Sequence, residues 1–272
     1  MDITDNHFHL DPAGQKEKAV KSFLKSGGTR LVLVHKPYSP WNKIDQFKTQ
    51  VRTTLRLSEK ARDVGAKVAV ICSPHPVQLV KLLELYDSKK ACEIYLQAVD
   101  FCTSLVDERK IMGLGELGRP HFEVDEKIWN LSNDILRESL LRAKEVDSSV
   151  ILHTETGTPE VMADLANIAS KVGFPKSRLV KHYGGIGSVA NSYGLTVSLL
   201  ASNENIIFAS KNNHSFMLET DYLDDPNRPG AVLGPKTVPR KTIKLFEEGV
   251  IDEEQFSKIH TDLPDFIYKE FI

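Results

Sequence analysis

Short β-branched segments alternate with longer helical segments along the whole 272-residue chain. The alternation predicts parallel strands joined by helical crossovers, and several strand segments are apolar throughout, as expected of strands covered on both faces. Eight such repeats favour one closed α/β barrel of the TIM type, spanning residues 1–272, over an open sheet. We expect strands at Ile3–Leu10, Arg30–His35, Lys67–Cys72, Lys110–Glu116, Val150–Thr154, Arg178–Tyr183, Leu195–Ala201 and Ser215–Tyr222.

Helical patterns fill the intervals between these strands, and two more close the chain. The one long irregular stretch, Asp224–Pro239, follows the last strand, and in a barrel this position lies at the mouth. We expect helices at Gln15–Lys25, Lys43–Val64, Pro76–Tyr86, Ala91–Ser104, Glu126–Val146, Pro159–Val172, Ile186–Ser192, Glu204–Asn212, Lys241–Glu248 and Glu253–Ile272.

Histidine and carboxylate residues recur at the ends of the predicted strands. His7 and His9 stand two residues apart on the first strand, so their side chains point to the same face. Four more residues of these types come at the ends of the fourth, fifth, sixth and eighth strands: Glu116, His153, His182 and Asp221. Barrel enzymes build their active sites at this face. We therefore expect these six side chains to form one site.

Six nitrogen and carboxylate ligands without a thiolate suit divalent metal ions. A single catalytic zinc keeps three protein ligands, so six are a natural number for two ions that share a carboxylate. We expect His7, His9 and Asp221 on one ion, His153 and His182 on the other, and Glu116 as the bridge. Zinc is the expected metal, with manganese or magnesium as alternatives. Glu116 and Asp221 are the expected catalytic residues, Asp221 taking the proton of the nucleophilic water.

These residues stand in the order that TatD-like hydrolases show. His7-Phe8-His9, Gly113-Leu114-Gly115-Glu116-Leu117-Gly118, His153, His182 and Glu219-Thr220-Asp221 together resemble this branch of the metal-dependent amidohydrolase superfamily. The resemblance implies a TIM-type barrel, one or two metal ions and hydrolysis, commonly of DNA phosphodiesters. We expect a metal-bound hydroxide to attack the phosphodiester. A small-molecule amide or lactone hydrolase and a metal-bearing binding protein are the alternatives.

The chain departs from this family around the substrate. Members usually carry an arginine two residues after the histidine of strand five, where this chain has Glu155, a residue that would repel a phosphate. Arg119 and His121 replace part of the usual segment after Glu116 and are candidates to restore positive charge. Arg228, in the irregular stretch after Asp221, is a third candidate substrate contact.

The composition limits the kinds of partner that the protein can bind. Lys plus Arg number 35 and Asp plus Glu number 37, so the formal net charge is −2, which excludes binding driven by bulk positive charge. The longest apolar runs are far shorter than the roughly 18 residues of a membrane span. Three widely spaced cysteines indicate free thiols in a reducing compartment, so we expect a cytoplasmic protein. Its expected partner is a phosphodiester or small-molecule substrate, with nucleic acid as one form and no membrane.

Overall fold

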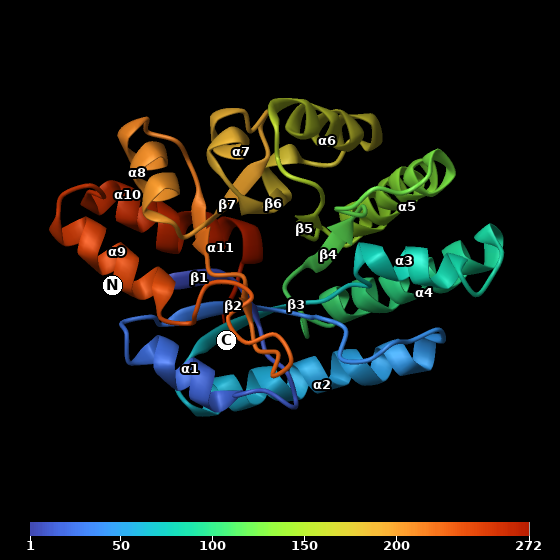
Figure 1. The fold of residues 1–272 in the computed structure, drawn as a ribbon, viewed down its shortest axis with the longest axis horizontal. Coiled ribbons are helices and arrows are strands. Elements are labelled where there is room, and N and C mark those ends of the chain that lie inside the picture. The colour runs from blue at the N-terminus through green and yellow to red at the C-terminus, as the bar shows by residue number, and fades with distance from the viewer. Residues whose placement is uncertain (272) are drawn as a thin grey trace.

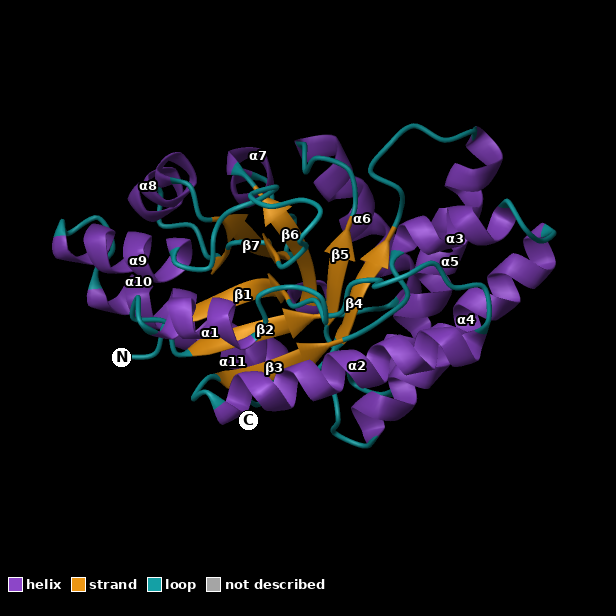
Figure 2. Ribbon diagram, turned by 60° about the horizontal axis from the view of Figure 1, so that its bottom comes forward, coloured by secondary structure: helices purple, strands orange, loops and turns teal. Residues whose placement is uncertain are grey.

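Parallel strands alternate with helices through residues 1–271, which the computed structural model describes (Figure 1). Figure 2 shows the strands as the central layer with the helices packed outside it. All eight expected strands form, so the barrel prediction is confirmed. The strands are β1 (Thr4–His9), β2 (Arg30–Val34), β3 (Lys67–Ile71), β4 (Leu114–Gly118), β5 (Val150–His153), β6 (Leu179–Gly184), β7 (Thr196–Leu200), β8 (Met217–Glu219) and β9 (Tyr222–Leu223).

The strands follow the order of a barrel. One sheet has the order β3-β2-β1-β9 and the other β4-β5-β6-β7-β8, all neighbours being parallel. The gap between β3 and β4 is crossed by backbone hydrogen bonds, including one of 2.7 Å from Met112 to Val70. On the other side β9 pairs with β1, and the Asn6 amide donates to the carbonyl of Leu218 on β8.

Two predicted strands differ from the structure. The fourth begins at Leu114 rather than Lys110, because Arg109 (φ 54°) lies in a turn after the preceding helix. The eighth, predicted as one strand over Ser215–Tyr222, is split into β8 and β9. Asp221, with a φ of 51°, leaves the extended conformation between them.

Helices pack around the barrel, both between successive strands and after the last one. They are α1 (Glu17–Leu24), α2 (Ile44–Asp63), α3 (Pro76–Leu83), α4 (Ser88–Asp107), α5 (Glu126–Glu145), α6 (Pro159–Val172), a 3₁₀ turn (Lys176–Arg178), α7 (Ile186–Ala190), α8 (Asn203–Lys211), α9 (Thr237–Glu247), α10 (Glu253–Ser257) and α11 (Leu263–Tyr268). No helix within residues 1–271 is long and apolar enough to cross a membrane.

The predicted last helix is interrupted, and its final residue, Ile272, lies outside the described residues. A π-helical turn at Lys258–Asp262 separates α10 from α11. Pro264 has no N–H to donate to the carbonyl of His260, so the regular helix cannot continue there. The hydroxyl of Thr4 donates to that carbonyl instead, at 2.5 Å. The interruption thus ties the end of the chain to β1.

Two apolar layers surround the strands. Side chains that point inward, among them Val32, Ile71 and Val180, form a small cluster inside the barrel together with Ile267 and Tyr268 of α11. Outward-facing side chains form the larger cluster beneath the helices. The inward-facing positions that follow at the carboxyl ends of β5 and β6 are His153 and His182. The register of the barrel therefore directs these histidines towards its axis.

Candidate metal centre

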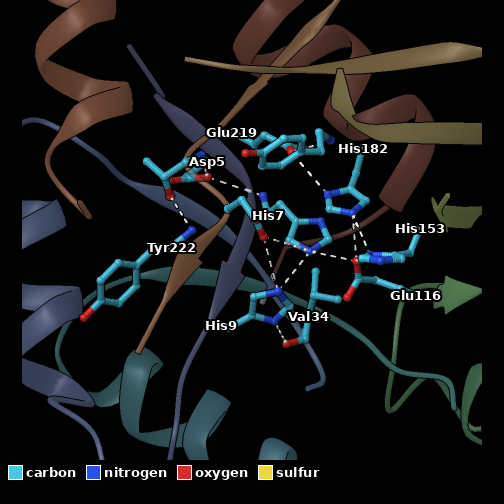
Figure 3. Close-up of polar contacts among 12 residues, drawn as sticks. Asp5, His7, His9, Val34, Glu116, His153, His182, Glu219 and Tyr222 are labelled. Carbon is cyan, nitrogen blue, oxygen red and sulfur yellow. Dashed lines mark hydrogen bonds and ion pairs between the residues drawn. The ribbon is translucent and has the colours of Figure 1, made fainter. Parts of the chain in front are cut away.

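His7, His9 and Asp221 converge at the mouth of the barrel (Figure 3 shows the two histidines). The Nε2 atoms of His7 and His9 are 3.2 Å apart, and Oδ1 of Asp221 lies 3.7 Å and 3.5 Å from them. Two nitrogens that bind one tetrahedral zinc at 2.0–2.1 Å lie about 3.3 Å from each other. The spacing of these three ligand atoms therefore fits a single ion.

Glu116, His153 and His182 form the adjoining group (Figure 3). Oε1 of Glu116 lies 2.9 Å from Nδ1 of His153 and 2.8 Å from Nε2 of His182, and these two nitrogens are 3.3 Å apart. The same oxygen is 3.7 Å from Nε2 of His7. Glu116 thus stands between the two groups, which is the place expected of a bridging carboxylate. All six sequence-predicted ligands lie together in the structure.

Hydrogen bonds on the far side of three rings leave the other ring nitrogen facing the centre. Nδ1 of His9 donates to the carbonyl of Val34 at 2.8 Å, and Nδ1 of His182 lies 3.2 Å from a carboxylate oxygen of Glu219. Nε2 of His153 lies 2.8 Å from Nδ1 of His121, so a proton on that Nε2 leaves its Nδ1 free. Such partners fix the tautomer of a histidine ligand and orient its ring.

The charge states of Glu116 and His7 suit cation binding, whereas burial is outweighed at His182, where Glu116 and Glu219 raise the pKa to about 10, so a cation must displace a proton from that ring. Burial alone would raise the pKa of Glu116, but the rings of His182 and His153 lower it well below its usual range. Burial, reinforced by the neighbouring His182, holds the pKa of His7 well below its usual value, so this ring is neutral. An ionised carboxylate and neutral imidazoles are the forms that bind metal.

Two buried carboxylates that were given no role from the sequence support the ligands. Oε1 of Glu219 accepts the backbone N–H of Tyr183 at 2.7 Å besides facing His182, and its side chain is fully buried. Asp5 accepts the backbone N–H of His7 and both the N–H and the hydroxyl of Thr220. Both lie two positions before a ligand in the sequence, Asp5 before His7 and Glu219 before Asp221, but only the fold shows their partners.

One ligand, Asp221, and the residue that follows another ligand, Tyr183, have strained backbones. Asp221 has a φ of 51° and Tyr183 a φ of 52°, in the left-handed region that side chains other than glycine rarely adopt. This conformation ends β8 and turns the Asp221 carboxylate towards His7 and His9. Strain of this kind persists where the surrounding structure over-determines it, and it concentrates at functional sites.

Two cavities meet over the ligands. The central cavity, of about 650 Å³, is lined by Glu116 and by four more of the ligands: His9, His153, His182 and Asp221. The side cavity, of about 750 Å³, shares His121, His153, His182, Tyr183 and Asp221 with it and extends between the loops that follow β5 and β6. A substrate held at the ligands can therefore extend into either.

Arg119 does not face these cavities. Its guanidinium donates to both carboxylate oxygens of Glu155, at 3.0 and 2.5 Å, to Asp164 at 2.6 Å and to Asn133 at 3.0 Å, and the residue is only 1% exposed. Arg119 lines neither cavity and points its guanidinium at these partners, which argues against Arg119 as a substrate contact. They also neutralise Glu155, so the expected repulsion of a phosphate by that residue falls away.

The other candidate substrate contacts line the central cavity. His121 faces His153, and Arg228 is exposed, with Nε 3.1 Å from Asp225. Lys36 and Lys81, not singled out from the sequence, line the same cavity. Neither belongs to a motif, and their positions depend on how the loop after β2, which carries Lys36, and helix α3, which carries Lys81, lie over the mouth.

His75, which precedes α3, also lies in the cluster. Its Nε2 is 3.8 Å from Oε2 of Glu116, and its ring packs against His153 with the centroids 4.4 Å apart. However, its Nδ1 accepts the backbone N–H of Val77, capping α3. The neutral ring therefore carries its proton on Nε2 and presents a donor to the cavity, unlike His9, which presents a lone pair.

Comparisons with known proteins place the chain in a family. Residues 4–269 match the family described as TatD related DNase. An uncharacterised protein of Methanocaldococcus jannaschii is 34% identical over 98% of this chain and 96% of its own.

Solved structures share the fold. A TatD-like protein of Archaeoglobus fulgidus superposes with a TM-score of 0.65 at 16% identity, covering 97% of this chain and 99% of its own. A TatD homologue of Escherichia coli K12 gives 0.63 at 17% identity, covering 98% of each chain. A D-hydantoinase gives 0.63 at 12%, covering 97% of this chain and 70% of its own. With the six ligands gathered at the mouth of the barrel, the chain belongs to the family of TatD-related DNases and is a metal-dependent hydrolase of the TatD and amidohydrolase type.

Proposed function

We propose that this protein hydrolyses phosphodiester bonds, acting on DNA, at two divalent metal ions, with zinc as the first candidate. The observation that carries the proposal is the set of cations around the central cavity: Lys36, Lys81 and Arg228 line it beside the ligands. A phosphodiester brings a negative charge, and its non-bridging oxygens need positive groups beyond the metals. An uncharged lactone or amide has no such need.

Neighbouring acids fix two of these cations in place. Nζ of Lys36 lies 2.6 Å from Asp11 and 3.9 Å from Asp225, while Arg228 donates to Asp225. Lys36 is buried, so its ammonium has little freedom to move. Groups held in advance at the position where charge develops stabilise a transition state without reorganising.

His7, His9 and Asp221 would hold one ion, His153 and His182 the other, and Glu116 would bridge them. When bound, two ions polarise the phosphoryl group and make a water molecule acidic enough to attack it at neutral pH. Asp221, which reaches both cavities, accepts the proton of the attacking water. The Nε2–H of His75 points at the same space and donates a hydrogen bond to a substrate oxygen.

A substrate panel tests the proposal. Purified protein supplied with Zn²⁺ or Mn²⁺ is assayed on single-stranded DNA, bis(p-nitrophenyl) phosphate, a lactone and an amide, before and after chelation. We expect metal-dependent cleavage of the two phosphodiesters and weaker cleavage by Lys36→Met. Lys67→Met is the control, because Lys67 is exposed and lies outside both cavities.

Other results of this substrate panel would support one of the two alternative functions. Faster cleavage of the lactone or amide would make the protein a hydrolase of carboxylic substrates. Metal binding without turnover of any substrate would make it a binding protein. We also propose a cytoplasmic location, which the free thiols of Cys72, Cys92 and Cys102 support.

A further inference from the structure

The side cavity is a second built space beside the metal ligands. Thr154–Pro159, after β5, form one wall, and Gly184–Ser188, after β6, form the other. At about 750 Å³ it falls within the range of small-molecule binding sites. Because it meets the central cavity at His153, His182 and Asp221, a group bonded to a reacting phosphate there can enter it.

A buried lysine of β6 lines this cavity. Lys181 is 1% exposed, and its Nζ donates to the backbone carbonyl of His182 at 2.6 Å. An ammonium group has three protons to donate. Within residues 1–271 no carboxylate oxygen lies within 4.0 Å of this nitrogen. Within the described residues Lys181 therefore forms no direct ion pair and lacks a full set of acceptors, and the carboxylates of Glu219, Glu155, Glu116 and Asp221 act on it only from beyond 4.0 Å.

The acids nearest Lys181 already have other partners: Glu219 faces His182 and the N–H of Tyr183, and Asp221 faces His7 and His9. Glu155 lines the cavity, but Arg119 binds both of its carboxylate oxygens. The negative charge of Glu155 is thus balanced by Arg119 and not by Lys181. A charge removed from water without a partner is unfavourable, and an anion entering the cavity would supply that partner.

We propose that the side cavity binds an acidic group of the substrate, a phosphate or carboxylate adjacent to the cleaved group, with Lys181 as its counter-ion. The inference rests on the proposed function, since it supposes that the cleaved phosphodiester lies at the metal ligands. In a DNA strand the acidic group is the neighbouring phosphate. The enzyme then distinguishes a strand from an isolated phosphodiester by a charge that takes no part in the reaction.

Binding measurements on three related ligands test this. Calorimetric titration of the metal-loaded protein compares thymidine 5′-phosphate with thymidine 3′,5′-bisphosphate and with the 5′-phosphate carrying a 3′-O-succinyl group. We expect the bisphosphate to bind about tenfold more tightly than the monophosphate, or better, as a charge-assisted hydrogen bond implies. An equal gain from the succinyl group identifies a general acid site, and a gain from phosphate alone identifies a phosphate site.

The Lys181→Met variant should lose this preference while binding thymidine 5′-phosphate as the parent does. Lys181→Gln serves as a second uncharged variant if Lys181→Met fails to fold, and Lys171→Met, exposed on α6, is the matched control. The inference is overturned if the parent binds all three ligands equally or if a folded variant keeps the preference. A preference that depends on Lys181, without hydrolysis of any phosphodiester, would sustain the side cavity and refute the proposed function.

Discussion

Replacing Arg119 by alanine tests how the loops after β4 and β5 are held together. The guanidinium joins Glu155, Asp164 of α6 and Asn133 of α5, and its carbon lies 4.5 Å from the ring centroid of Trp129. One side chain thus links three segments next to Glu116 and His153. We expect Arg119→Ala to act first on stability, while the metal ligands keep their positions in the folded fraction.

The size of the expected stability loss depends on how deeply Arg119 and its two acidic partners are buried. Removing one partner of a buried ion pair destabilises a protein by about 3–5 kcal/mol. The Glu155 and Asp164 side chains are 25% and 49% exposed, so water can solvate them after Arg119 is removed. We therefore expect a loss of about 3 kcal/mol, at the lower end of that range. Glu155→Ala leaves Arg119 paired with Asp164 and should lower the stability by about 1.5–3 kcal/mol.

Urea unfolding of the two single variants and the double variant gives these values. Since both changes remove the same contact, the double variant should be about as stable as Arg119→Ala. Arg137→Ala is the control, because its pair with Asp134 is exposed on α5 and worth less than about 1 kcal/mol. Single effects that simply add, or a loss below about 1 kcal/mol for Arg119→Ala, would refute the reasoning. By the same reasoning, Glu155→Arg should destabilise the protein by placing two guanidinium groups together.

Three further predictions concern Asp221, Glu219 and His260. Asp221→Asn should lower turnover by about 10²-fold or more, measured as kcat on bis(p-nitrophenyl) phosphate at saturating metal, and near-parental turnover would remove it as the base. Glu219→Gln should weaken metal binding by about 10–100-fold in a competition titration with a chelator, because His182 loses its anionic partner; unchanged affinity would contradict this. Burial lowers the pKa of His260 to about 3, so below its ordinary value of 6.5 the unfolded chain takes up a proton that the folded chain does not. Stability is then lost as pH falls, by about 2 kcal/mol at pH 5, and urea unfolding at pH 7 and 5 should show a smaller loss in His260→Gln.

The site ligands were predictable because each stands at or near the carboxyl end of a strand. A short apolar run followed by histidine or a carboxylate identifies the carboxyl end of a parallel strand, and all such ends meet at one face of a barrel. This pattern alone was enough to predict His153 and His182 as ligands. Asp221 was placed correctly as well, although the strand before it was predicted to continue through it.

The roles of the residues around the ligands depend on long-range contacts that cannot be predicted from the sequence. Arg119 and Glu155 are 36 residues apart, and their pairing requires the loops after β4 and β5 to lie side by side. The donor role of His75 depends on a single hydrogen bond from the backbone of Val77. Lys181 looked like an ordinary strand residue, because its burial, and its lack of a direct ion pair within residues 1–271, exist only in the folded barrel.

The last strands, β8 and β9, also determine when the barrel can close during synthesis of the chain. The hydrogen bond between Asp5 of β1 and Thr220, which follows β8, joins the first and last strands of the barrel. These two residues are 215 apart in the sequence. Until residue 220 has left the ribosome, β1 has a free edge, and the loop to be closed spans most of the chain. The site is therefore assembled last, after the other strands have been synthesised. A chain cut short before Met217 would present His7 and His9 on an open strand edge that invites pairing with another chain.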